Sequence, residues 1–196
     1  MAQFYLGTFT VPSSTGLQAI TGVGFQPKVV LFFSTLQAAY GESADTAVVL
    51  GWAAAPGGCA VGNASQHGVN PSNADRAQSP AHCLYWRSPA GAIELAAALS
   101  SFDADGFTLN WGAVTAGVQV HFLAIGGAEV QAKHGQFAMP TTTGDFSVTG
   151  VGFQPEVVLI QSARSPSASE SSYTENFLGW GAASSPASRW TTFSGD

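Results

Sequence analysis

The sequence predicts an all-β protein: an antiparallel β-sandwich of jelly-roll-like kind, duplicated along the chain, with the second copy incomplete. Short apolar segments with period-2 alternation recur between turn-forming residues, and no segment has a convincing helical period. In addition, the stretch 22–31 (GVGFQPKVVL) returns at 150–159 with nine of ten residues identical, at an offset of 128 residues. A repeat of that length is a whole domain, not a solenoid unit.

The repeat divides the chain into a complete unit at 1–130 and a partial second copy at 131–196. Counterparts of the segment from about 84 to 127 are absent from the second copy. We expect either that the natural polypeptide continues past Asp196, which we favour, or that a partner subunit completes the unit. The structural anchors that the repeat duplicates are Phe25, Pro27 and Trp52 in the first unit and Phe153, Pro155 and Trp180 in the second.

The first half of the unit predicts strands at 3–10, 18–21, 29–33 and 46–55. Gly22 and Gly24 make a bend, because glycine adopts positive φ without a Cβ penalty. Pro27 fixes its own φ and favours an extended residue before it, so it starts the next strand. The 29–33 strand (VVLFF) is apolar on both faces, which is typical of a central strand. Trp52 and Trp180 are interpreted as core anchors, since each repeats with its strand.

The second half of the unit predicts a long loop at 56–81, which is rich in Gly, Asn, Ser and Pro. Strands are expected at 82–87, 93–101, 107–111 and 118–125. The 93–101 segment contains three consecutive alanines, but its two-residue apolar period favours a strand over a helix. Asp103, Asp105 and Gly106 are typical of a tight turn between two strands.

The charge content limits the classes of partner. Only 9% of residues are charged, and six Lys and Arg against twelve Asp and Glu give a net charge of −6. Phosphate backbones and anionic membranes are recognised by Lys and Arg clusters, so we expect neither nucleic acid nor a membrane as a partner. No apolar run reaches the 18 or so residues that span a bilayer, and the N-terminus has no signal-peptide pattern. Few charges suit a surface packed against neighbouring subunits or a protein that works outside a cell, and the general composition habit of the source explains them equally well.

Four residues could be combined into a zinc site: Cys59, His67, His82 and Cys83. Their spacing is poor, because adjacent strand residues point to opposite faces and no CxxC pair is present. Buried or loop thiols are the preferred interpretation, and a single bridge between Cys59 and Cys83 is more plausible than a metal site. We therefore expect no metal and no cofactor.

The remaining polar candidates do not form a catalytic pattern. Asp103 and Asp105 resemble the start of a calcium loop, but the later ligands do not follow, so a hairpin turn is preferred. His121 has no nucleophile or orienting acid assigned to it. Glycoside hydrolysis needs a pair of carboxylates, and nothing in the sequence selects one. We expect the protein not to be an enzyme.

Four short motifs carry a family resemblance: Gly-Phe-Gln-Pro at 24–27, Gly-Trp at 51–52, Phe-Asp-Ala-Asp-Gly-Phe at 102–107 and Phe-Leu-Ala-Ile-Gly-Gly at 122–127. In this order they resemble a domain that recurs in structural proteins of tailed bacteriophages. The resemblance implies a non-enzymatic virion component, either a head decoration or cement protein or part of a tail fibre. It also implies other virion proteins as partners, homo-oligomerisation, and a place on the virion surface after synthesis in the host cytoplasm.

A carbohydrate-binding module that recognises host glycans is the alternative function. Aromatic rings can stack on sugars, and polar loops can supply hydrogen bonds. The candidate ligand or interface aromatics are Tyr40, Tyr85, Trp86, Trp111 and Trp190.

Overall fold

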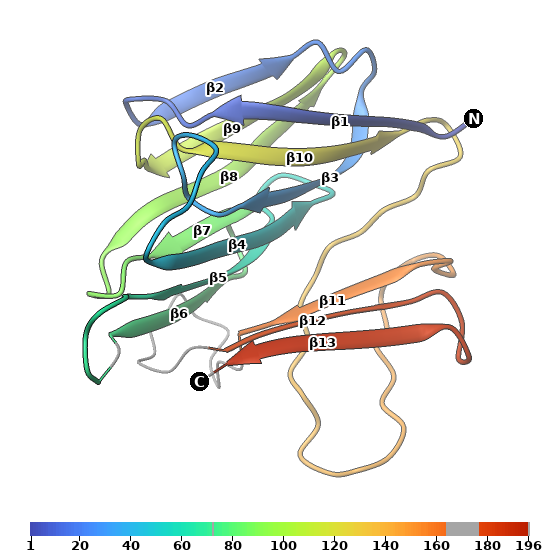
Figure 1. The fold of residues 1–196 in the computed structure, drawn as a ribbon. Helices are drawn as coiled ribbons and strands as arrows, with labels where there is room; N and C mark the ends of the chain where they lie inside the picture. The colour runs from blue at the N-terminus through green and yellow to red at the C-terminus, as the bar shows by residue number, and fades with distance from the viewer. Residues whose placement is uncertain (72, 164–176, 196) are drawn as a thin grey trace.

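The computed structural model describes residues 1–71, 73–163 and 177–195, which form antiparallel sheets connected by turns and extended segments (Figure 1). The larger sheet has the order β1 (Gln3–Thr10), β10 (Gln119–Gly126), β3 (Pro27–Ser34), β4 (Thr46–Ala53), β5 (Cys59–Ser65), β6 (Ala74–Ser79). The second has the order β2 (Gly16–Thr21), β9 (Gly106–Ala113), β8 (Ile93–Asp103), β7 (Leu84–Arg87). The third contains β11 (Val158–Ser162), β12 (Phe177–Ala183) and β13 (Arg189–Gly195).

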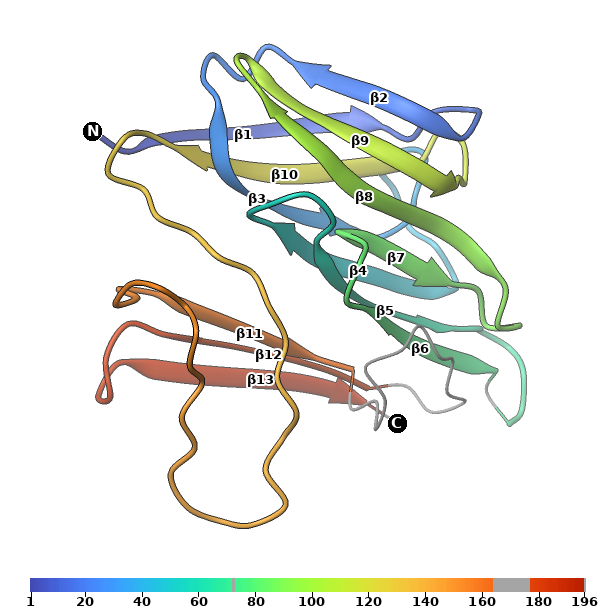
Figure 2. The same cartoon turned by 180° about the vertical axis from the view of Figure 1, so that it is seen from behind.

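The first two sheets pack face to face, which confirms the predicted β-sandwich (Figure 2). Phe32 of β3 meets Phe107 of β9 at 5.7 Å between ring centroids, and Phe107 meets Phe122 of β10 at 5.1 Å. Both pairs are edge-to-face, the arrangement that aromatic quadrupoles favour. Val30 and Phe32 are fully buried, so β3 is the central strand that its apolar run predicts. Within the described residues, no helix is long and apolar enough to cross a bilayer.

The predicted loop at 56–81 is wrong, because β5 and β6 lie there and extend the larger sheet. These strands carry small side chains in place of the alternating large apolar residues that mark a strand in sequence. Their size has a structural reason: a Cβ on Gly62 would lie 2.6 Å from the Tyr85 carbonyl oxygen of β7. Close approach of β7 to β5 thus requires small residues that resemble a loop composition.

The turns agree with the sequence prediction. Gly22 and Gly24 have φ of +84° and +83°, and the backbone turns between Asp103 and Gly106. Asp105 joins the two features, since its carboxylate accepts hydrogen bonds from the Gly22 N–H at 3.0 Å and the Gly24 N–H at 2.5 Å. The β8–β9 hairpin is thereby fixed to the bend that precedes β3.

The second sequence copy does not reproduce the structure of the first. Residues 131–157 contain no strand where the first copy has β1 and β2, and Figure 2 shows this segment running past the three-stranded sheet before β11 begins. β11 and β12 correspond in sequence to β3 and β4, but Leu159 pairs with Ala182, whereas its counterpart Leu31 pairs with Trp52. The pairing is therefore shifted by two residues, which keeps each side chain on its face.

The repeat anchors differ in their environments. Pro27 is buried and Phe25 packs against the core, whereas Pro155 is exposed. Trp52 and Trp180 are half-buried, and Trp52 lies on the face of β4 turned away from the sandwich core. The interpretation of Trp52 as a core anchor is wrong, because the core-facing positions of β4 are Val49, Gly51 and Ala53. The lack of a Cβ at Gly51 lets the segment entering β7 approach closely.

Candidate functional site

Three of the five candidate ligand aromatics are part of the interior. Tyr85, Trp86 and Trp111 are 0%, 9% and 2% exposed, so the prediction that they are available for a ligand is wrong. Both buried indoles have acceptors: Trp111 Nε1 donates to Gln18 Oε1 at 2.9 Å, and Trp86 Nε1 donates to the Asn63 carbonyl oxygen at 3.1 Å. Tyr85 and Trp86 lie in β7, which is buried on both faces, whereas Trp111 lies on the core-facing side of β9 with Phe107 and Leu109. Alternation alone did not show which face of each strand the other sheet covers.

The other two aromatics are accessible, and one of them borders a hollow. Tyr40 is 82% exposed and Trp190 is 51% exposed. The Tyr40 ring lies 6.0 Å from the His121 ring, centroid to centroid, at an interplanar angle of 34°. Thr8 Oγ1 lies 3.0 Å from Nδ1 of His121, which orients the imidazole. A hollow of about 230 Å³ lies beside these rings, lined by Thr35, Gln37, Ala39, Tyr40, Gly41, Gln119 and His121.

The loop that carries Tyr40 is held at its base by an unusual backbone. Leu36 has φ of +61°, a conformation that residues with a Cβ rarely adopt. The Leu36 N–H donates to Ser34 Oγ at 3.0 Å, and that hydroxyl donates to the Gln119 carbonyl oxygen at 2.8 Å. The Gln119 N–H in turn donates to the Gln37 carbonyl oxygen at 2.8 Å. β3, β10 and the loop are thereby linked beneath the hollow.

A second hollow of about 170 Å³ is also lined by residues of this loop. Thr35 and Gln37 line both hollows, and the second also includes Asp45 and Trp86. Asp45 Oδ1 accepts a hydrogen bond from the His67 N–H at 2.8 Å, which connects the loop to the end of β5. Hydroxyl, amide and aromatic groups on both sides can bind a neutral polar ligand.

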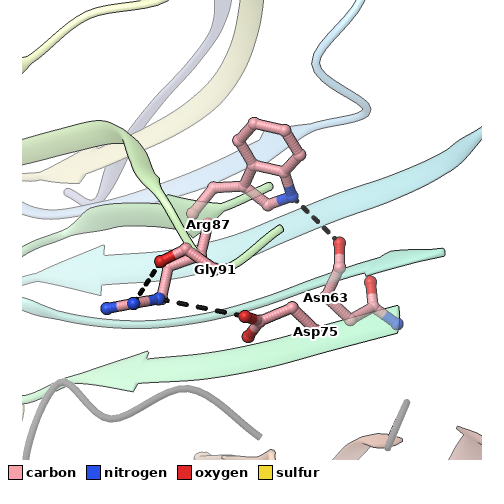
Figure 3. A network of polar contacts seen from close by, with 5 residues as sticks. Asn63, Asp75, Arg87 and Gly91 are labelled. Atoms are coloured by element: carbon pink, nitrogen blue, oxygen red, sulfur yellow. Dashed lines mark hydrogen bonds and ion pairs between the residues drawn. The ribbon is translucent and has the colours of Figure 1, made fainter. Parts of the chain in front are cut away.

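A polar network lies where β5, β6 and β7 meet (Figure 3). Asp75 is 4% exposed, and its Oδ2 lies 4.0 Å from Nε of Arg87. The Arg87 guanidinium also donates to the Gly91 carbonyl oxygen, and Trp86 reaches the Asn63 carbonyl from the same strand. Burial of this pair orients β6 and β7 and gives the network a structural role.

The two cysteines are free thiols, which agrees with the preferred interpretation of buried or loop thiols, and the alternative bridge between them is not formed. Burial raises the pKa of Cys59 to about 12 and also raises that of Cys83. Both sulfurs therefore remain protonated at neutral pH and are poor nucleophiles and ligands. His82 is engaged elsewhere: its Nδ1 lies 2.9 Å from Ser79 Oγ and its ring stacks on Tyr85. Among the described residues, no three His, Cys, Asp or Glu side chains are grouped to hold a metal.

The two aspartates of the β8–β9 turn have structural partners. Asp103 accepts hydrogen bonds from the hydroxyls of Ser101 and Thr108, both at 2.7 Å. Asp105 accepts from the bend described above. The predicted hairpin turn between β8 and β9 is confirmed.

His134 makes a long-range contact that the sequence did not predict. The Ala54 N–H donates to its Nδ1 at 3.1 Å, which joins the segment after β10 to the end of β4. Desolvation on burial lowers the pKa of this imidazole. The neutral ring is therefore the bound form, and no local motif marks such a long-range contact.

Comparisons with known proteins found no relative of this chain. No family model matches the chain, and no curated protein or solved structure matches it significantly.

Proposed function

We propose that this protein is a non-enzymatic structural component of a tailed-bacteriophage particle, which assembles through the outer face of its larger sheet. The observation that carries the proposal is an apolar row across five strands of that sheet. Direct pairing places the members of the row on one face: Leu6, Leu123, Leu31, Trp52 and Cys59. β12 lies against β5 at one end of the row. At the other end Leu6 is 79% exposed, and Phe4 beside it is 66% exposed.

The edge of the sheet has the same character as its outer face. β1 is an outermost strand, and it contains no Asp, Glu, Lys or Arg, nor does its neighbour β10. Proteins that stay monomeric usually protect an exposed edge with charges, proline or bulges. An uncharged edge beside exposed Phe4 and Leu6 is suited to a neighbouring subunit. The placement in a phage particle is supported by the sequence resemblance of 24–27, 51–52, 102–107 and 122–127.

Sedimentation velocity over a concentration series tests the assembly. We expect the wild-type chain to self-associate, and the double substitution Phe4→Ser and Leu6→Ser to sediment as a monomer at concentrations where the wild type is associated. Leu17→Ser is the matched control, because Leu17 is 72% exposed on β2 in the other sheet. A monomeric wild type, or equal loss of association in the control, contradicts assembly through this face.

Carbohydrate recognition at the Tyr40 hollow is a second candidate. The favourable observation is an aromatic ring that is 82% exposed beside Gln37, Gln119 and Thr35, a combination of stacking surface and neutral polar groups. On a glycan array, we expect Tyr40→Ala to abolish binding and Tyr40→Phe to retain it, since stacking needs only the ring. The absence of any saturable binding by the wild type contradicts this candidate.

A further inference from the structure

The bend before β11, in the second copy, has the same backbone conformation as the bend before β3, in the first copy. In the first copy a carboxylate is bound at this bend. In the first copy Gly22 and Gly24 direct their N–H groups at the two carboxylate oxygens of Asp105, and Val23 N–H donates to the Asp105 carbonyl oxygen at 3.2 Å. Consecutive N–H groups in such a bend form a concave site for an anion. The β8–β9 hairpin is the element that supplies the anion.

The second copy repeats this bend, and within the part of the chain that the structure describes no carboxylate accepts a hydrogen bond from it. Gly150 and Gly152 have φ of +80° and +90°, close to the values of their counterparts. Within the described ranges, neither N–H group donates to an acceptor, and both glycines are exposed. Lys133 Nζ donates to the Gly150 carbonyl oxygen, so a positive charge lies beside the bend. This cation and the N–H groups of the bend attract a negatively charged group.

Apolar residues that follow the bend are exposed where their counterparts are buried. Val30 and Phe32 are 0% exposed under the β9 residues Phe107 and Leu109, whereas the corresponding Val158 and Ile160 are 41% and 44% exposed. The same holds before the bend, where Val148 is 51% exposed and its counterpart Ile20 is 7% exposed. A sheet element covers this face in the first copy, and among the described residues of the second copy no strand takes its place.

We propose that this surface, formed by the 150–152 bend with Val158 and Ile160, is a docking site for a partner polypeptide that presents a β-hairpin with an Asp-x-Asp-Gly turn. The second aspartate of the turn accepts hydrogen bonds from the Gly150 and Gly152 N–H groups, and the apolar face of the hairpin covers Val158 and Ile160. The surface is separate from the outer face of β1 and β10.

A second copy of this chain does not fit the site. Its own hairpin is bound to Gly22 and Gly24 through Asp105, and the hairpin residues Phe107 and Leu109 are fully buried in its core. Releasing the hairpin would open one core in order to cover another. The occupant is therefore a different segment with the same chemistry.

Fluorescence anisotropy with the full chain and a labelled peptide of residues 93–113, the sequence of β8 and β9, tests the proposal. We expect saturable binding that D105A in the peptide weakens by about tenfold or more, because two charge-assisted hydrogen bonds are lost. E94A in the peptide is the matched control, since it also removes one carboxylate. On the protein, Ile160→Asp should abolish binding, and Leu17→Asp should leave it unchanged.

A second measurement tests the proposal even if the free peptide does not form a hairpin. The same residues are appended after Asp196 through a flexible linker, which raises their effective concentration to about millimolar. Hydrogen exchange should then slow at the Gly150 and Gly152 amides with the native hairpin, and not with its D105A form. Unchanged exchange in the appended chain, or equal binding of the native and D105A peptides, overturns the proposal. Self-association of the wild type that Ile160→Asp removes overturns it too, in favour of a second copy.

Discussion

The substitution Gly51→Ala tests how closely the two main sheets approach. Gly51 is buried in β4, and a Cβ added there would lie 2.0 Å from the Cys83 carbonyl oxygen and 2.9 Å from its carbonyl carbon. Both atoms belong to the backbone, so β4 and the segment entering β7 must separate by roughly 1 Å to remove the overlap in a close-packed interior. We expect the free energy of unfolding to fall by about 3 kcal/mol, the upper end of overpacking costs.

The sequence repeat provides a matched control at Gly179, which occupies the same Leu-Gly-Trp motif in β12. The nearest atom to an added Cβ there is the side-chain atom Cε1 of Phe177 at 3.4 Å. Gly179→Ala should therefore be neutral or stabilise by about 0.5 kcal/mol, because alanine loses less backbone entropy than glycine. Urea unfolding followed by circular dichroism measures both. If the two variants differ by less than about 0.5 kcal/mol, the packing of β7 against β4 is not as described.

Three further predictions concern single contacts. Trp86→Phe removes the donor to the buried Asn63 carbonyl and should cost about 1–2 kcal/mol of unfolding free energy, whereas Trp190→Phe should have no effect in the same urea titration. Asp105→Ala should accelerate hydrogen exchange at the Gly22 and Gly24 amides, and unchanged exchange would exclude the carboxylate as their acceptor. Burial lowers the pKa of His134, so the stabilisation of the folded protein by the neutral imidazole is present above the ordinary pKa of 6.5 and is lost as pH falls below that value. His134→Ala should flatten this part of the curve of unfolding free energy against pH. An unaltered curve would contradict the burial of a neutral His134.

The sequence predicted the strands that contain large apolar residues and clear turn signals. β3, β8, β9 and β10 agree with expectation because the continuous apolar run of β3, the alternation of the other strands and the Asp-Ala-Asp-Gly turn are local features. β5 and β6 were missed for a non-local reason: Gly62 is small because Tyr85, 23 positions later in the chain, passes close to it. A rule based on large alternating residues cannot detect a strand whose size limit comes from the opposite sheet.

In the candidate site, too, local features were predicted from the sequence and features that depend on distant contacts were not. The sequence identified Tyr40 as an aromatic within a polar loop, and the structure places it beside His121. It could not exclude Tyr85 or Trp111, since burial depends on which faces the other sheet covers. Leu36 and its positive φ carried no sequence signal, because this conformation is maintained by two hydrogen bonds, from the Leu36 N–H to Ser34 Oγ and from the Gln119 N–H to the Gln37 carbonyl oxygen.

The central claim is that this protein is a structural part of a particle, and quantitative mass spectrometry of purified phage particles from its native source tests it most directly. We expect peptides of this chain to be present at a fixed copy number relative to the major capsid protein, and to remain after high-salt washing. High salt screens charge contacts but does not weaken apolar burial of the Phe4 and Leu6 surface. Recovery of the protein only in the soluble lysate, with none in the particles, would contradict the claim.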